Sequence, residues 1–139
     1  MALPKQRLGI ALAGCGRFGE FCLPAAGDLP QLRLVGVTDS ARARAQAVAA
    51  RHGITAHPDY AALLGDDRVD ILIVATPPAD YAPMALAAIT VGKHVFCEKP
   101  LATCLPEATA VVQAASARGV RLSVDYVLRW NALYRPLGT

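Results

Sequence analysis

The sequence is poor in charged residues and has no long hydrophobic run. Charged side chains make up 18% of its 139 residues, and no uninterrupted apolar stretch reaches the length of about 18 residues that a membrane-spanning helix needs. The 14 Lys and Arg residues are scattered along the chain, and the net charge is only +3. We therefore expect no membrane insertion and no nucleic-acid partner.

Cysteine and histidine occur without the spacings of metal sites or redox motifs. The four cysteines form no C-x-x-C pair, and the three histidines lie apart from one another and from the cysteines. This pattern predicts reduced thiols, no metal and a cytoplasmic location. Leu12–Cys15 also resembles a bacterial lipoprotein cleavage box behind Lys5 and Arg7. Its apolar core of about seven residues is at the lower limit for a signal peptide, and cleavage would destroy the first predicted strand.

A glycine motif follows the first predicted strand, the apolar run 8–13. Gly14, Gly16 and Gly19 form the pattern G-x-G-x-x-G, and the next segment is typical of a helix. In such a unit the first glycine makes the turn and the second allows a pyrophosphate to approach the backbone. The third lets the helix pack closely on the sheet. The free amides and positive dipole end of the helix then form an anion site.

An acidic residue stands where such a unit needs one. A second apolar run, 32–37, leads to Asp39, which comes 20 residues after Gly19. At this spacing a carboxylate meets the ribose hydroxyls of a dinucleotide. Asp39 is also suited to cap the helix that follows, which is compatible with ribose binding. It favours NAD over NADP because it repels a 2′-phosphate, although Arg42 or Arg44 can accept that phosphate.

Strand and helix patterns alternate along the whole chain, which predicts an α/β fold. We expect a Rossmann doubly wound parallel sheet of about six strands with helices on both faces. Residues 1–125 form this domain and 126–139 a tail. Pro24 should shorten or bend the first helix. Strands are predicted at 8–13, 32–38, 54–56, 69–75, 93–97 and 120–124, and helices after Gly19 and at 41–52, 61–64, 80–91 and 103–118.

The loops after four of these strands should share one surface, because ligands bind at the carboxyl ends of parallel strands. They contain Gly14–Gly19, Asp39 and Ser40, Thr76–Pro78, and Glu98–Pro100. Thr76–Pro78 can equally do no more than end its strand.

These loops carry a resemblance to a known family. Gly14–Gly19, Val74–Pro78, Val95–Pro100 and the segment Tyr126–Tyr134 resemble the Gfo/Idh/MocA family of NAD(P)-dependent sugar and polyol oxidoreductases, over nearly all of the chain. The resemblance implies a Lys99 beside the nicotinamide and substrate, and a cis peptide bond between Lys99 and Pro100. The resemblance also implies a substrate domain of roughly 200 further residues, which would begin at about the point where this sequence stops.

Lys99 is the predicted catalytic residue, because a cation there can stabilise alkoxide charge during hydride transfer. Without the resemblance, Lys99 would be interpreted as a surface lysine paired with Glu98. Three predicted cofactor-binding residues have an alternative interpretation. Tyr81 can be a packing residue at the start of a helix, and Arg129 and Trp130 can belong to a solvated terminus. The predicted cofactor-binding residues are Gly14, Cys15, Gly16, Arg17, Phe18, Gly19, Asp39, Ser40, Ala75, Thr76, Pro77, Pro78, Tyr81, Glu98, Lys99, Pro100, Arg129 and Trp130.

The predicted function is the dinucleotide-binding part of an oxidoreductase, inactive without a substrate domain. The alternative is a non-catalytic binding or protein-interaction module derived from such an enzyme. Apolar residues make up 54% of the chain, so some surface should need a cover. We expect a homodimer through a face that carries Leu122, Val124, Val127 and Trp130.

Overall fold

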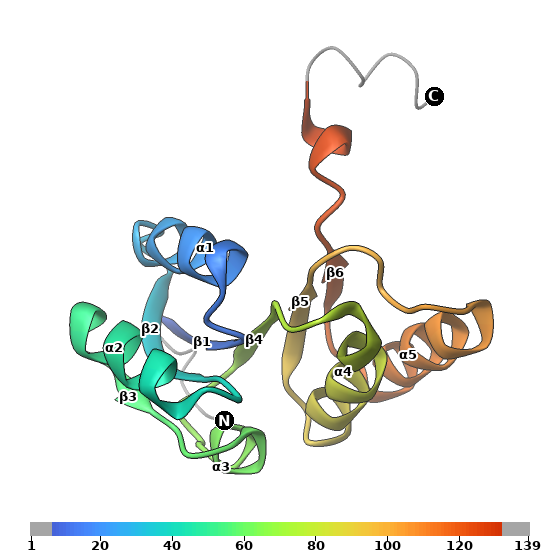
Figure 1. Ribbon diagram of the computed structural model, residues 1–139. Helices are drawn as coiled ribbons and strands as arrows, with labels where there is room; N and C mark the ends of the chain where they lie inside the picture. Colours follow the sequence, from blue (N-terminus) through green and yellow to red (C-terminus); the bar gives the residue numbers. More distant parts are fainter. Residues whose placement is uncertain (1–6, 132–139) are drawn as a thin grey trace.

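A computed structural model describes residues 7–131. Its centre is a sheet of six parallel strands in the order β3-β2-β1-β4-β5-β6 (Figure 1). This order reverses between β1 and β4, which is the Rossmann switch point. The predicted fold class is therefore confirmed. The strands are β1 (Leu8–Ala13), β2 (Leu32–Thr38), β3 (Thr55–Ala56), β4 (Ile71–Val74), β5 (His94–Cys97) and β6 (Leu122–Val124).

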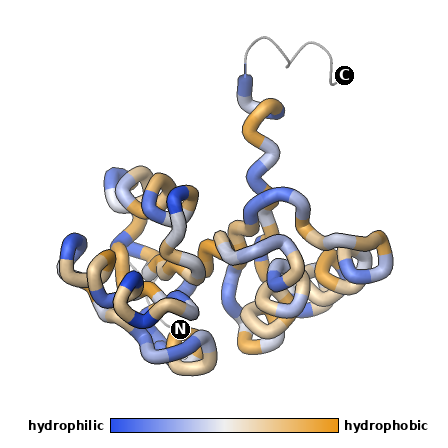
Figure 2. The backbone as a smooth tube through the Cα atoms, viewed as in Figure 1, coloured by the Kyte–Doolittle hydropathy of each residue, from blue (hydrophilic) through white to orange (hydrophobic). Residues whose placement is uncertain are grey.

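Helices lie on both faces of the sheet, as predicted. One apolar cluster joins α1 and α2 to one face, and a second joins α3, α4 and α5 to the other. Figure 2 shows hydrophobic residues along the central strands between these layers. The helices are α1 (Arg17–Gly27), α2 (Arg42–His52), α3 (Tyr60–Leu64), α4 (Tyr81–Thr90) and α5 (Leu105–Arg118), with short 3-10 turns η1 (Pro78–Asp80) and η2 (Val127–Trp130).

The expected shortening of the first helix at Pro24 is not found. Helix α1 starts at Arg17 and runs without interruption to Gly27, with Pro24 in its interior. A proline removes one helical N–H bond, but here Leu23 and Ala26 on either side of it are buried against the sheet. Their packing keeps this turn helical.

The predicted apolar face at the last strand is not uniformly exposed. Leu122 and Val124 are half-buried and pack against the apolar cluster that includes residues of α4 and α5. Beyond the sheet, Val127 and Trp130 are 54% and 72% exposed. No helix among residues 7–131 is long and apolar enough to cross a membrane. The homodimer stays a prediction.

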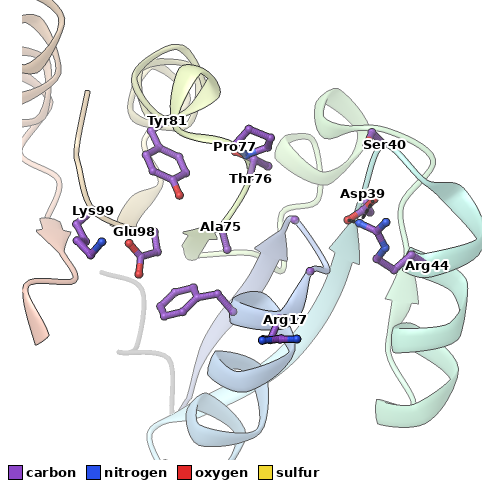
Figure 3. Close-up of a pocket in the computed structure, with 13 residues that line it drawn as sticks. Arg17, Asp39, Ser40, Arg44, Ala75, Thr76, Pro77, Tyr81, Glu98 and Lys99 are labelled. Carbon is purple, nitrogen blue, oxygen red and sulfur yellow. Dashed lines mark hydrogen bonds and ion pairs between the residues drawn. The ribbon is translucent and has the colours of Figure 1, made fainter. Parts of the chain in front are cut away.

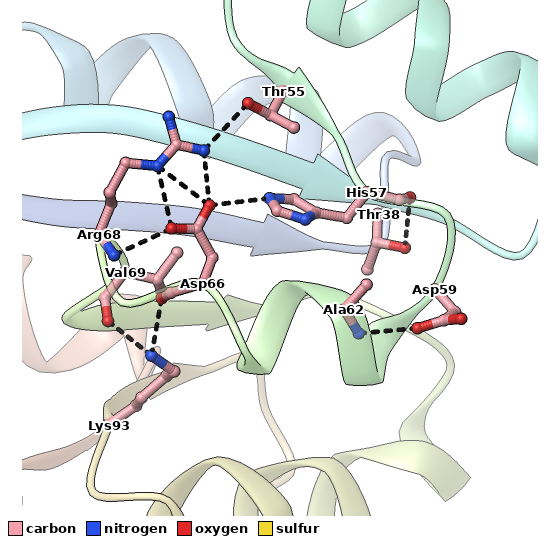
Figure 4. Close-up of polar contacts among 9 residues, drawn as sticks. All are labelled: Thr38, Thr55, His57, Asp59, Ala62, Asp66, Arg68, Val69 and Lys93. Atoms are coloured by element: carbon pink, nitrogen blue, oxygen red, sulfur yellow. Dashed lines mark hydrogen bonds and ion pairs between the residues drawn. The ribbon is translucent and has the colours of Figure 1, made fainter.

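A polar network joins the two halves of the sheet below the site (Figure 4). Asp66 receives hydrogen bonds from Arg68, of which the Nη2–Oδ2 contact is 2.6 Å. These bonds lower the pKa of Asp66 to about 2. His57 Nε2 lies 3.4 Å from Oδ2 of Asp66, and burial lowers the pKa of His57. The buried Lys93 ammonium donates to the carbonyl oxygens of Asp66 and Val69 at 3.1 and 2.8 Å.

We predict that Asp66→Asn lowers the melting temperature by about 4 °C at neutral pH, as a loss of roughly 1 kcal/mol does in a domain of this size. A carboxylate with a depressed pKa stabilises the fold above the unfolded pKa, near 4, and this stabilisation disappears as pH falls toward about 2. The gap between the wild type and the variant should therefore close over that range. Thermal melts at a series of pH values measure it. Asp67→Asn, at an exposed neighbour, is the control, and a gap that persists at pH 2 contradicts the prediction.

Candidate functional site

A cleft of about 560 Å³ opens at the carboxyl ends of the strands (Figure 3). It lies over the switch point, where the loops after β1, β2, β4 and β5 meet. The predicted convergence of these loops is therefore present in the structure. The lining residues are Gly14, Gly16, Arg17, Phe18, Asp39, Ser40, Arg44, Ala75, Thr76, Pro77, Tyr81, Glu98 and Lys99.

The three glycines of the loop after β1 differ in whether, and why, the structure requires glycine at that position. Gly14 has a φ of +95°, and a Cβ there would overlap the carbonyl of Ala75, so only glycine fits this turn. A Cβ on Gly19 would overlap the carbonyl oxygen of Gly14, whereas a Cβ on Gly16 would meet no atom within 4 Å. Gly14 and Gly19 therefore serve the packing, and Gly16 faces open space at the start of α1.

Two backbone amides hold this loop against the end of β2. The Gly14 N–H donates to the carbonyl of Thr38 at 2.9 Å, and the Cys15 N–H donates to Oδ2 of Asp39 at 2.7 Å. Burial and the Asp39 carboxylate raise the pKa of the Cys15 thiol to about 12. Cys15 is thus a buried neutral thiol that supports the loop rather than a reactive one.

The Asp39 carboxylate accepts hydrogen bonds from three residues. Besides the Cys15 N–H, Asp39 accepts the Ala41 N–H through Oδ1 at 2.7 Å. The N-cap residue of α2 is Ala41, which has no side-chain cap bond, so Asp39 holds the turn before the helix and does not cap it as predicted. Arg44, in the first turn of α2, places Nη1 3.4 Å from Oδ2. The Arg44 side chain is 53% exposed and that of Asp39 only 5%. The acidic end of the cleft is therefore covered by a guanidinium that solvent can reach.

The other half of the cleft comes from the loops after β4 and β5. Tyr81 is buried at the start of α4, where burial and Glu98 raise its pKa. The Thr76 hydroxyl lies 3.3 Å from Sδ of Met84. Lys99 is exposed at the rim, and its bond to Pro100 is cis, as the resemblance implied.

Most predicted site residues meet in this cleft, but some do not. Among the cofactor-binding predictions, Gly19, Pro78, Pro100, Arg129 and Trp130 do not line it. Cys15 lines an adjoining depression with Gly16, Arg17, Glu20 and Arg44. Arg129 lies over the ring of Tyr126 in the tail, 5.9 Å from its centroid.

Arg44 is the lining residue that the predicted binding set lacked. The sequence places Arg44 five residues after Asp39, close to the start of the next helix. Helix α2 starts at Arg42, and its direction lets the Arg44 side chain in its first turn reach back over the end of β2 to Asp39.

The cleft, the glycine loop and the acidic end of β2 define a dinucleotide-binding Rossmann domain. The family model described as "Oxidoreductase family, NAD-binding Rossmann fold" matches residues 8–126. The chain therefore belongs to the Gfo/Idh/MocA oxidoreductase family and corresponds to its NAD(P)-binding domain.

Curated relatives of the chain are longer enzymes. Inositol 2-dehydrogenase 3 of Saccharopolyspora erythraea is 42% identical over 105 residues, which is 75% of this chain and 31% of the relative. A 4-carboxy-2-hydroxymuconate-6-semialdehyde dehydrogenase of a Sphingobium species is 34% identical over 88% of this chain and 39% of its own. The chain thus spans roughly a third to two fifths of the relatives it matches.

Two solved structures show the same fold with a dinucleotide. GenD2 from gentamicin A biosynthesis, in complex with NAD, aligns with a TM-score of 0.90 at 28% identity, over 98% of this chain and 40% of that one. KijD10, a 3-ketoreductase from Actinomadura kijaniata in complex with NADP, has a TM-score of 0.88 at 28% identity, over 94% of this chain and 42% of its own.

We predict that Gly19→Ala lowers the free energy of unfolding by about 2 kcal/mol, because the added methyl group meets a backbone carbonyl that the β1–α1 turn fixes. Gly16→Ala is the matched control in the same loop. Its methyl group meets open space, so the cost should stay below about 1 kcal/mol. Urea unfolding followed by circular dichroism measures both, and equal losses would show that Gly19 does not limit how closely the helix packs.

Proposed function

We propose that this chain binds NAD(H) and presents it for hydride transfer to or from a hydroxyl or keto carbon of a sugar, polyol or related substrate. The observation that carries the proposal is the meeting of a glycine-lined helix start, a buried carboxylate and an exposed lysine in one cleft. Relatives named as inositol dehydrogenases and a 3-ketoreductase support this substrate class.

Each end of the cleft suits one part of the dinucleotide. Asp39 and Ser40 suit the adenosine ribose. The first amides of α1 suit the pyrophosphate, because Gly16 supplies no side-chain cap for them and the dipole end of the helix is positive. The nicotinamide would then lie beside Thr76, Pro77 and Tyr81. When bound, it supplies the hydride acceptor or donor.

Lys99 has the position and the charge to act on the substrate oxygen. When hydride reaches a keto carbon, negative charge develops on its oxygen. An ammonium group preorganised beside that oxygen stabilises this charge. In the opposite direction the same ammonium group stabilises the alkoxide from which hydride leaves.

Turnover needs a wall that residues 7–131 do not supply. Lys99 lies exposed at the rim of the cleft, whereas hydride transfer is favoured in a site from which water is excluded. The relatives that share this domain carry most of their length outside it. We therefore propose that the substrate is enclosed by a second domain and that this chain alone binds the cofactor without turnover.

Calorimetric titration with NAD(H) and NADP(H) tests the proposal. We predict binding of NAD(H) with a dissociation constant below 1 mM. We also predict weaker binding of NADP(H), because Asp39 repels the 2′-phosphate. No heat and no thermal shift with either dinucleotide at millimolar concentration would reject the function and leave the fold unaffected.

Arg44 should determine how strongly NADP is disfavoured. Its guanidinium lies over Asp39 and can accept a 2′-phosphate, so Arg44→Ala should weaken NADP(H) binding about tenfold and change NAD(H) binding little. Arg42→Ala, two residues away and outside the cleft, is the matched control. If Arg44→Ala leaves the ratio of the two dissociation constants unchanged, Arg44 does not select the cofactor.

Lys99 is tested in an enzyme that joins these residues to a substrate domain. We predict that Lys99→Met lowers kcat by at least about 100-fold, the scale of a lost charge-stabilising group, and weakens NAD(H) binding far less. Lys99→Arg should restore part of the rate. Turnover that survives Lys99→Met would instead support the non-catalytic role for this residue, as a surface lysine beside Glu98.

A further inference from the structure

Two tyrosines at the starts of neighbouring helices have hydroxyl groups in different surroundings. Tyr60, the first residue of α3, donates its hydroxyl to the carbonyl oxygen of Met84 at 2.6 Å. Tyr81, the first residue of α4, is only 5% exposed, yet its hydroxyl makes no hydrogen bond with residues 7–131. A buried phenol usually has a hydrogen-bond partner. Because Tyr81 lines the cleft, we expect its partner to be a ligand there.

The Glu98 carboxylate lies on the side of the cleft to which the Tyr81 hydroxyl points. Figure 3 shows this hydroxyl directed from the start of α4 into the cleft, toward Glu98 in the loop after β5. The main chain of Glu98 is fixed, because its N–H donates to the carbonyl oxygen of Val74 at 3.1 Å. Its side chain is half-buried and accepts no hydrogen bond from the described part of the chain. A donor and an acceptor therefore face the same part of the cleft.

The protonation states of these two groups define what they can bind. Burial and Glu98 raise the pKa of Tyr81, so the phenol keeps its proton and can donate a hydrogen bond. An ionised carboxylate can only accept one. A primary amide has the complementary pair of groups, an oxygen that accepts and a nitrogen that donates. The two side chains thus match an amide in one orientation.

No other polar side chains of the cleft offer this combination. The Thr76 hydroxyl lies 3.3 Å from Sδ of Met84. Lys99 can only donate and is exposed at the rim. Asp39 lies at the opposite end, where its carboxylate already accepts backbone amides. The match to an amide is therefore found at the end of the cleft that the proposed function assigns to the nicotinamide.

We propose that Tyr81 and Glu98 recognise the carboxamide group of the nicotinamide ring. The Tyr81 hydroxyl donates to the amide oxygen, and the Glu98 carboxylate accepts from the amide nitrogen. This inference rests on the proposed function, because it requires that the chain binds a nicotinamide dinucleotide. Two contacts on one side of the ring stop its rotation about the bond to the ribose, so that one face is presented for hydride transfer.

The same pair rejects a dinucleotide whose ring carries an acid in place of the amide. In nicotinic acid adenine dinucleotide an ionised carboxylate takes the place of the carboxamide and meets Glu98 with like charge. By calorimetry with the full chain, this ligand should bind at least about tenfold more weakly than NAD. Glu98→Gln removes the repulsion and should reduce the difference to about threefold or less.

A matched pair of variants tests the tyrosine. Tyr81→Phe removes only the hydroxyl and should weaken NAD binding about fivefold. Binding of ADP-ribose, which has no nicotinamide ring, should stay within about twofold of the unchanged chain. Tyr60→Phe is the control, because it removes a buried hydroxyl that is bonded to Met84 and should affect both ligands equally. Melting curves check that both variants fold.

The comparison of NAD with ADP-ribose separates this inference from the proposed function. Equal affinity of the unchanged chain for NAD and its nicotinic acid counterpart overturns the carboxamide site. So does a Tyr81→Phe variant that binds NAD as tightly as the unchanged chain, or that loses NAD and ADP-ribose binding to the same extent. In these cases the chain still binds the dinucleotide, and the proposed function stands. A chain that binds neither NAD nor ADP-ribose rejects both.

Discussion

The site depends on the attachment of the glycine loop to the end of β2. Gly14 and Cys15 donate their amides to Thr38 and to Asp39, one strand away, and the left-handed turn at Gly14 lets the loop pass against Ala75. The loop is therefore fixed by β2 on one side and β4 on the other. The start of α1 can point only into the cleft between them, which is how a helix end becomes a defined anion site.

Much of the fold could be predicted from the sequence because the strands are buried on both faces. Runs such as 8–13 and 71–75 are continuously apolar, as fully covered parallel strands are. Gly53 and Gly119 stop their helices in the left-handed conformation. The helix was not shortened at Pro24 as expected, because a propensity describes an isolated helix, whereas Leu23 and Ala26 are buried against the sheet.

The candidate site was predictable where topology alone determined it. Because the strands are parallel, Asp39, Thr76 and Lys99 lie at the same edge of the sheet, independently of the conformations of their side chains. Arg44 was left out of the binding set, because only the direction of α2 shows that its guanidinium returns to Asp39. The packing of Leu122 and Val124 against the apolar cluster of α4 and α5 was missed for a similar reason, because the face of the sheet on which each crossover lies decides which strand residues pack beneath it.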